Sequence, residues 1–320
     1  MSQLVRHIQA ASPRQSTGIS QKVFAQMRLE NAGVHGPFLI HAAQPTLLAA
    51  VWALFRETQL ASGVPRAHQE TIALLIAEEN RCPWCIEAHQ LAMYTQQPNP
   101  EIVACYKANP NPLEHSSIHG SSVQAMIAYR AAVLLWQYIN RMTNVLLVKS
   151  AWQNFGSLRG PLTRVMGHVF GAFFLNRRYI PERSLEFIAE APLPAHLAWA
   201  EPHHNIAVAL AYFHHQVNRL AAGIIPDHVQ IFVLEFVHEH RGQNMGLSRR
   251  WADDAVQSLE PAQQPIAQLL LLTALASYQI DDELISQVRR ILPADADLLA
   301  LLAWGSYAMY NHLEPVMRAQ

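Results

Sequence analysis

Charged residues are scarce in this sequence. Only 15% of its 320 residues are Asp, Glu, Lys or Arg, and the formal net charge is −1. A nearly neutral chain without a run of Lys or Arg lacks the electrostatic footprint of a protein that binds nucleic acid or an anionic membrane. Hydrophobic residues make up 51% of the chain. We therefore expect part of the apolar surface to be buried between domains, or between the subunits of a homo-oligomer.

Long uninterrupted apolar runs are also missing. The N-terminal stretch MSQLVRHIQAASPRQ contains no continuous apolar segment of the kind found in secretory signal peptides. The most apolar early segment, residues 37–55, is interrupted by His41, Gln44 and Pro45, which a lipid-exposed helix would not readily tolerate. We expect a cytoplasmic protein that does not enter the membrane.

Cysteine occurs only three times, as Cys82, Cys85 and Cys105. Three cysteines in a chain of this length cannot form the disulfide framework of a small secreted protein. Cys82 and Cys85 are separated by two residues, a spacing that suits a redox pair or two metal ligands better than a structural staple in a reducing compartment. Cys105, in the segment EIVACYKA, is expected to occupy a buried apolar position.

Signals for β-strands are nearly absent. Apolar residues recur at intervals of three and four, as in residues 72–76 and 229–236, which is the periodicity of amphipathic helices. Proline is favoured at helix starts, and it opens apolar segments at Pro45, Pro83, Pro100 and Pro181. Ser121 and Ser122 are candidate caps for a long helix over residues 123–142. The sequence predicts an all-α protein with roughly a dozen helices or more.

One segment recurs within the chain. LASGVPRAHQETIALLIAEENR begins at Leu60 and LAAGIIPDHVQIFVLEFVHEHR begins at Leu220, 160 residues later. Without a gap, seven of the thirty positions 60–89 are identical in the two copies, whereas chance would give about two. A fixed offset of this kind indicates a duplicated unit. We predict two homologous helical domains, residues 1–157 and residues 158–320.

The second copy lacks the chemically capable residues of the first. At the same offset, Glu70, Cys82, Cys85 and His89 are replaced by Gln230, Gly242, Met245 and Arg249. A helical unit can therefore be built without these four side chains. This comparison within one chain favours a functional role for them in the first domain, and it makes the second domain a degenerate copy that supplies packing and subunit contacts.

The segment around the cysteines is expected to be a helix–turn–helix. A helix over residues 66–80 should end near Asn80, because asparagine tolerates the left-handed conformation of a helix end. The next helix should begin with Cys82 near its N-cap and Pro83 at its first position. This arrangement places the cysteine pair at a helix N-terminus.

Folding these helices back on each other would bring Glu70 alongside His89. Cys85 and His89 are four residues apart and share one helix face. A helix N-terminus favours the thiolate form of a nearby cysteine. His89 can accept the Cys85 proton, and Glu70 can fix the imidazole tautomer and stabilise its charged form. The pattern indicates a thiolate nucleophile beside a second thiol, at the spacing of reversible redox pairs.

This motif resembles the signature of the AhpD-like alkylhydroperoxidases, within the carboxymuconolactone decarboxylase superfamily. It reads Glu-x11-Cys-x2-Cys-x3-His and consists of Glu70, Cys82, Cys85 and His89. Residues 37–70 are similar to the helical segment that precedes the site in that family, and LLALLAWGSYAMYNHL resembles its closing helix. The decarboxylase branch usually lacks the cysteine pair, so decarboxylation is not expected.

The resemblance implies an all-helical oligomer that acts as a thiol-dependent peroxidase or disulfide oxidoreductase in antioxidant defence. It implies that Cys85 attacks a hydroperoxide and becomes a sulfenic acid, and that Cys82 resolves this acid as a disulfide. His89 and Glu70 would form the proton relay. An outside dithiol protein, lipoyl or thioredoxin-like, would reduce the disulfide, and no cofactor is implied.

One position departs from the family pattern. The residue before the second cysteine is a histidine of the relay in the best-known branch, whereas here it is Trp84. We interpret Trp84 as part of an apolar site for the substrate or a partner, and we expect a lower rate of peroxide reduction.

Other interpretations of the cysteine pair remain open. Cys82, Cys85 and His89 could be three ligands of a zinc ion, which needs a fourth, or the pair could be purely structural. The alternative to an enzyme is a non-catalytic helical protein whose pair senses oxidants or binds zinc. The nucleophile is open as well, because a helix-capping position favours Cys82 and proximity to His89 favours Cys85.

Histidine is frequent, with 17 in the chain. Some histidines cluster, at positions 203–204, at positions 214–215, and at His238 with His240. Neighbours one or two positions apart point to different sides of a helix. We therefore expect these clusters at a domain interface or in solvent rather than on a metal ion.

Overall fold

The computed structural model describes residues 4–9, 12–31, 33–108, 121–150, 159–175, 177–240, 243 and 245–318. Over these ranges the chain folds into helices, and the extended backbone pairs only in an isolated bridge between Val5 and Leu147. The prediction of an all-α protein is confirmed.

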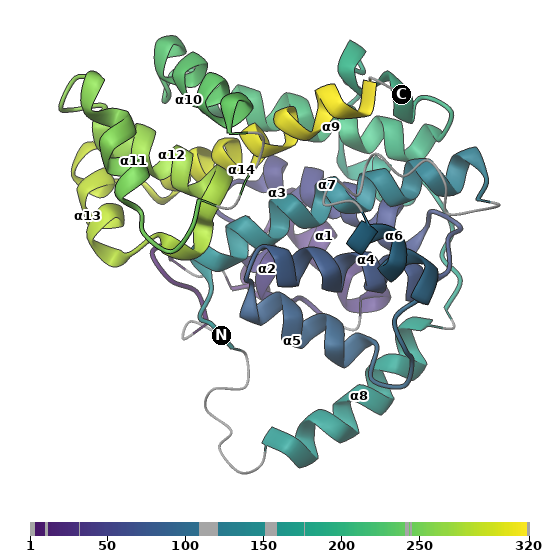
Figure 1. Cartoon of the computed structure of the whole chain (residues 1–320). Coiled ribbons are helices and arrows are strands. Elements are labelled where there is room, and N and C mark those ends of the chain that lie inside the picture. Colours follow the sequence, from purple (N-terminus) through teal and green to yellow (C-terminus); the bar gives the residue numbers. More distant parts are fainter. Residues whose placement is uncertain are drawn as a thin grey trace.

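The helices of the first half surround a long central one (Figure 1). They are α1 (Gly18–Glu30), α2 (Gly36–Leu39), α3 (Pro45–Phe55) with a π-helical extension (Arg56–Leu60), α4 (Arg66–Glu79), α5 (Pro83–Ala92), α6 (Pro100–Ala108) and α7 (Val123–Leu146). The hydroxyl of Ser122 accepts a hydrogen bond from the N–H of Ala125 at 3.2 Å and caps the long helix α7, as predicted.

The second half is also helical. It contains α8 (Arg159–Leu175), α9 (His204–Ala221), α10 (Asp227–Glu239), α11 (Arg250–Ala255), α12 (Gln264–Ala276), α13 (Asp282–Ile291) and α14 (Asp295–Arg318). Short 3₁₀ turns occur at Leu185–Phe187, Ala195–Ala200, Val256–Ser258 and Ser277–Gln279.

The helix expected after Pro181 is not formed. Residues 181–184 make a turn, and a single 3₁₀ turn, Leu185–Phe187, follows. The cause is the buried carboxylate of Glu57, which accepts hydrogen bonds from the N–H of Glu182 at 2.8 Å and from the hydroxyl of Ser184 at 2.6 Å. Glu182 adopts a positive φ of 71° to make this contact. A tertiary interaction therefore overrides the local helix-start signal.

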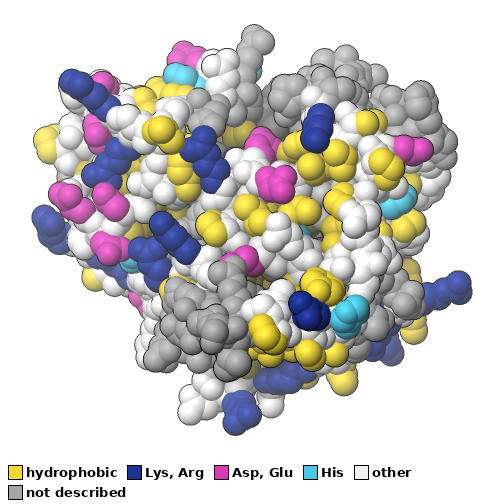
Figure 2. Space-filling model, turned by 60° about the horizontal axis from the view of Figure 1, so that its bottom comes forward, with side chains coloured by type: hydrophobic (Ala, Val, Ile, Leu, Met, Phe, Trp, Pro, Cys, Tyr) yellow, Lys and Arg dark blue, Asp and Glu magenta, His cyan; other side chains and the backbone are white. Residues whose placement is uncertain are grey.

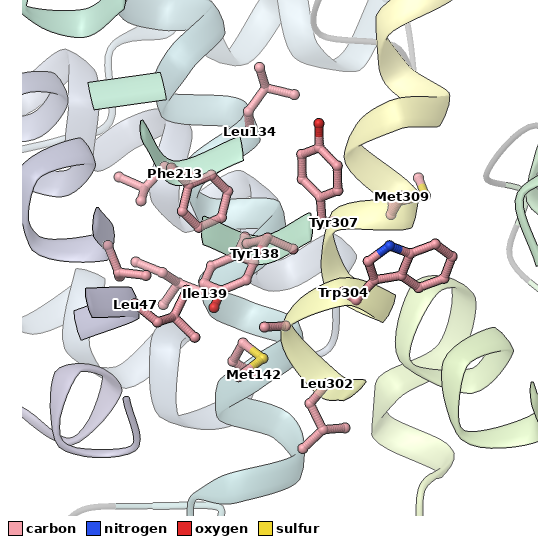
Figure 3. Packing of buried hydrophobic residues seen from close by; sticks show 14 of the residues in the cluster. Leu47, Leu134, Tyr138, Ile139, Met142, Phe213, Leu302, Trp304, Tyr307 and Met309 are labelled. Atoms are coloured by element: carbon pink, nitrogen blue, oxygen red, sulfur yellow. The ribbon is translucent and has the colours of Figure 1, made fainter. Parts of the chain in front are cut away.

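One hydrophobic core spans both halves of the chain. α3 packs on α9, α7 packs on α14, and α14 also packs on α9 and α12. Figure 3 shows the rings of Tyr138, Phe213 and Tyr307, which come from α7, α9 and α14, packed together. The ring of Phe213 lies edge-on to Tyr138, with centroids 4.9 Å apart, and next to Tyr307 at 6.3 Å. This packing fixes α7, which in turn supports the helices around the cysteine pair.

The offset of 160 residues appears in part of the structure. α3 and α9 begin at Pro45 and His204, and α4 and α10 begin at Arg66 and Asp227. Gly63 and Gly223 precede these second helices and both take a positive φ, of 78° and 83°. At the position of α5, the described residues 243 and 245–249 are not helical, and α11 starts only at Arg250. The division at residue 157 stays a prediction.

Helix α8 lies at the edge of the molecule beside α5 (Figure 1). The sequence assigns α8 to the second domain, yet it packs against α5 and α4 of the first. Gly167 permits a close approach to Tyr94, because a Cβ atom at this position would overlap the tyrosine ring. Figure 2 shows hydrophobic side chains scattered among charged groups on this side of the molecule. α8 therefore brings residues of the second half close to the cysteine-bearing helix.

Substitution of Gly36 tests how tightly the side chains around Trp84, next to the cysteine pair, are packed. A Cβ atom at Gly36 would lie 2.9 Å from Cδ1 of Leu147 and 3.0 Å from Cζ2 of Trp84, and both neighbours are buried. Overpacking of this kind usually lowers the free energy of unfolding by about 1–3 kcal/mol. We expect that loss for Gly36→Ala in urea denaturation.

Gly160 supplies a matched control. It lies in α8, and a Cβ atom there would meet nothing within 4 Å. Because alanine favours the helix over glycine by up to about 1 kcal/mol, Gly160→Ala should keep or raise the stability. Equal denaturation midpoints for the two variants would contradict the tight packing at Gly36.

Candidate active site

The turn between α4 and α5 positions the candidate site. Asn80 is the C-cap of α4. Beyond it, the N–H of Cys82 donates to the carbonyl of Ala77 at 2.9 Å, and the N–H of Arg81 donates to that of Glu78 at 3.1 Å. These two bonds form a Schellman motif, which places the left-handed residue one position after the C-cap. That residue is Arg81, with φ of 50°, whereas Asn80 has φ of −76°. The helix therefore ends near Asn80 as expected, but the expectation of a left-handed Asn80 is wrong.

The second half of the chain braces this turn. The guanidinium of Arg81 lies over the ring of Tyr278, 4.7 Å from its centroid. Asn144 of α7 donates from Nδ2 to the carbonyl of Asn80 at 2.9 Å and to the hydroxyl of Ser277 at 3.0 Å. The position of α5 relative to α4 therefore depends on contacts with residues far along the chain.

The cysteine pair occupies the start of α5. Cys82 is the N-cap, and Pro83 holds the first helical position, as predicted. Cys82 and Cys85 are joined as a disulfide, with their Cα atoms 5.3 Å apart. Both side chains are buried, with 0% and 2% of their surface exposed. The first turn of a helix has N–H groups without intrahelical partners, and these favour a negative charge on a nearby sulfur when the pair is reduced.

Glu70 and His89 meet across the α4–α5 hairpin. Nδ1 of His89 lies 2.7 Å from Oε2 of Glu70, and both side chains are buried. An ionised carboxylate can only accept, so Nδ1 is the donor and Nε2 carries the lone pair when the imidazole is neutral. Nε2 is buried and makes no hydrogen bond with any described residue. The structure thus brings Glu70 and His89 together, but it contains no hydrogen bond from His89 to Cys85.

Arg66 also belongs to the site, although no motif in the sequence singles it out. Its NH2 atom lies 2.5 Å from Oε1 of Glu70, one helical turn away on α4. Burial alone raises the pKa of Glu70, but its contacts with Arg66 and His89 outweigh burial and hold that pKa at about 2. Glu70 is therefore an anion at any physiological pH. The available signal was the spacing of four residues between an Arg and a Glu, which more often marks an exposed helix pair.

A cavity of about 300 Å³ opens beside the cysteine pair. Its walls come from α2, α3, α4, α5, α7 and α8 and are mostly apolar. The lining includes Phe38, Phe55, Arg66, Glu70, Trp84, Cys85, His89, Leu91, Trp136, Ile139 and Met166. Cys82 does not line this cavity in the part of the chain that the structure describes. The cavity can hold a small, largely apolar molecule next to Cys85 and His89.

Two tryptophans shape this cavity. Trp84 lies in the first turn of α5 and is 9% exposed, and Gly36 lies close to its ring. The ring of Trp136, from α7, stands edge-on to the imidazole of His89 with centroids 4.3 Å apart. These contacts restrict the orientation of the imidazole. Trp136 and Met166 carry no sequence signal that distinguishes them from core residues, because they reach the cavity only through the tertiary fold.

The other candidates lie away from this cavity. Cys105 on α6 is only partly buried, so the expectation of a buried apolar position is wrong. His214 hydrogen-bonds Tyr307 of α14, and burial lowers the pKa of His214 to about 4. His203 approaches the carbonyl of Ser62 at 3.4 Å. In the described ranges, no group of three or more His, Cys, Asp or Glu side chains is arranged to hold a metal ion.

Comparisons with known proteins give one curated relative of nearly full length. The chain is 29% identical to the protein named alkyl hydroperoxide reductase Rv2159c from Mycobacterium tuberculosis, over 95% of this chain and 92% of the relative. No family model matches the sequence. No solved structure matches it either. Within the described ranges, no helix is both long and apolar enough to cross a membrane.

The extent of this match means that the similarity is not limited to the cysteine motif. It covers the segments around Glu70, Cys82, Cys85 and His89 and also the second half of the chain. The comparison therefore supports assignment of the chain to the AhpD-like alkylhydroperoxidases, the family that the motif resembles.

Proposed function

We propose that the protein is a thiol-dependent peroxidase and disulfide oxidoreductase that uses the Cys82–Cys85 pair. The observation that carries this proposal is the position of the disulfide at the N-terminus of α5, beside a cavity that is also lined by His89, whose buried Nε2 has no hydrogen-bond partner among the described residues. The similarity to a protein named alkyl hydroperoxide reductase supports a peroxidase-like antioxidant role.

Cys85 is the proposed nucleophile because it lines the cavity. In the reduced protein, Nε2 of His89 accepts the Cys85 proton, directly or through a water molecule, and the thiolate attacks the terminal oxygen of a hydroperoxide. The O–O bond breaks, the alkoxide leaves as an alcohol after it takes up the proton, and Cys85 becomes a sulfenic acid. Glu70 holds the imidazole in the tautomer that this transfer requires.

Cys82 is the proposed resolving residue. Its thiol displaces hydroxide from the Cys85 sulfenic acid, so water leaves and the disulfide forms. The Cα separation of 5.3 Å allows this bond without a rearrangement of the helix. A dithiol protein, lipoyl or thioredoxin-like, then reduces the disulfide by thiol–disulfide exchange and returns both cysteines to thiols. Two electrons thus pass from the dithiol to the peroxide.

The apolar wall of the cavity supports Trp84 as a residue that contacts the substrate or the reducing partner. Its indole ring replaces a possible proton-transfer group, which fits the expectation of a slow peroxidase. Assembly into a homo-oligomer and a cytoplasmic location remain predictions that rest on composition and on the family resemblance.

A turnover assay tests the proposed function. We expect an organic hydroperoxide to be consumed when a dithiol such as dihydrolipoamide is supplied. Cys85→Ser and Cys82→Ser should reduce this rate to background, because each variant lacks one of the two thiols that the cycle requires. Cys105→Ser is the matched control and should keep the wild-type rate.

If the wild type forms the disulfide but turns over hydroperoxide only at the background rate, the result would favour the alternative of a non-catalytic oxidant sensor. Stoichiometric zinc in the purified protein would favour the zinc site.

The pH dependence tests His89 as the base. At neutral pH the thiol needs a proton acceptor, whereas at alkaline pH hydroxide ionises it without help. We expect His89→Ala to slow the peroxide reaction about 100-fold at pH 7 and much less at pH 9. The measurement is the single-turnover rate of the reduced protein across this range. An equal loss at both pH values would count against His89 as a base.

A further inference from the structure

Arg66 is a partly buried charge that has no role in the proposed catalytic cycle. It occupies the first position of α4, and its side chain is 11% exposed. NH2 contacts Oε1 of Glu70 at 2.5 Å, and NH1 donates to the carbonyl of Gln59 at 2.8 Å. Its guanidinium also lies 5.7 Å from the ring centroid of Phe55. These contacts place the guanidinium of Arg66 on Oε1 of Glu70, while Nδ1 of His89 contacts Oε2.

This arrangement decides where the protons of the site reside. With Arg66 in place, Glu70 stays ionised and accepts from Nδ1 of His89, so that Nε2 carries the lone pair when the imidazole is neutral. Without a cation, the buried Glu70–His89 pair would keep one more proton up to a higher pH. In both resulting forms, an imidazolium beside a carboxylate or an imidazole beside a carboxylic acid, Nε2 carries hydrogen. A protonated Nε2 cannot accept a proton from a thiol.

The charged neighbours of this pair are few. Glu70 faces Arg66 from its own helix and His89 from α5. α7 faces the imidazole with the uncharged ring of Trp136. Apart from Cys85, the other described residues that line the cavity include two titratable side chains, His35 and Glu87. Arg66 is the single Arg or Lys in that described lining. Removal of Arg66 thus takes away the cation that opposes proton uptake by the pair.

The second half of the chain provides an internal comparison. At an offset of 160 residues, the counterparts of Arg66, Glu70 and His89 are Pro226, Gln230 and Arg249. α10 starts at Asp227 without an arginine. Arg249 pairs instead with Asp281 at 2.6 Å, and Gln230 donates to the carbonyl of Ile225. The arginine is absent where the glutamate and the histidine are absent, so a helix of this kind does not need it in order to begin.

We propose that Arg66 is a positioning residue that keeps Glu70 as an anion and thereby holds His89 in the tautomer with an unprotonated Nε2. For a neutral imidazole, the tautomer follows from the contact between Nδ1 of His89 and Oε2 of Glu70. Its consequence for turnover rests on the proposed function. Arg66 touches neither the cysteines nor the peroxide in this account, and it acts through Glu70.

The protonation state of His89 can be read directly. We expect ¹⁵N NMR of the ¹⁵N-histidine-labelled protein at pH 7 to show an unprotonated Nε2 for His89 in the wild type and in Arg66→Lys, which keeps the charge. In Arg66→Met, Nε2 should be protonated over most of the population. Arg66→Gln carries the same expectation if the methionine variant does not fold. Arg6→Met, which removes an exposed ion pair with Asp282, is the control and should match the wild type.

Thiol reactivity gives a second measurement that needs no peroxidase activity. We expect the acid limb of the pH profile for alkylation of reduced Cys85 by iodoacetamide to move up by about one pH unit in Arg66→Met, roughly a tenfold lower rate on that limb. Arg66→Lys should restore the wild-type profile, which a merely structural role would not predict. An unprotonated Nε2 and an unshifted profile in both neutral variants would overturn the inference. Altered protonation in a protein without peroxide turnover would instead leave the inference standing and contradict the proposed function.

Discussion

Two buried side chains from successive helices, Glu70 of α4 and His89 of α5, meet at 2.7 Å, and the chemistry proposed for the cysteine pair depends on this contact. A buried carboxylate is unfavourable unless it is paired. Arg66 supplies a fixed positive charge on one oxygen, so the other oxygen is free to orient the imidazole. The result is a ring with one nitrogen committed to Glu70 and the other unpaired next to the cavity that Cys85 lines.

The rest of the fold holds this contact in place. The Schellman turn through Arg81 determines how α5 leaves α4, and the stacking of Arg81 on Tyr278 ties that turn to the second half of the chain. α7 supports the site from behind through Trp136, and α14 supports α7. α8 adds Met166 to the cavity wall. In this account the second half carries no reactive residues, and it still contributes to the site by bracing the hairpin and closing one side of the cavity.

Structural features that depend on the local sequence pattern could be predicted from the sequence. Helix periodicity predicts the all-α class, Pro83 predicts the start of α5, and the spacing from Glu70 to His89 is compatible with the hairpin contact. Features that are determined by tertiary contacts could not be predicted from the sequence. The turn after Pro181 follows the buried Glu57 rather than its own helix signal. Arg81 rather than Asn80 is left-handed because Asn80 is itself the C-cap and the left-handed position comes one residue after it. Met166 joins the site from α8, whose placement no local pattern encodes.

The most direct test of the account is a single turnover of the reduced protein without any reductant. A hydroperoxide is added in substoichiometric amounts, and the thiols are counted and mapped by mass spectrometry. The account predicts that two thiols disappear for each peroxide consumed, that both belong to Cys82 and Cys85 as an intramolecular disulfide, and that Cys105 stays reduced. Loss of a single thiol per peroxide, oxidation of Cys105 instead, or no reaction at all would contradict it.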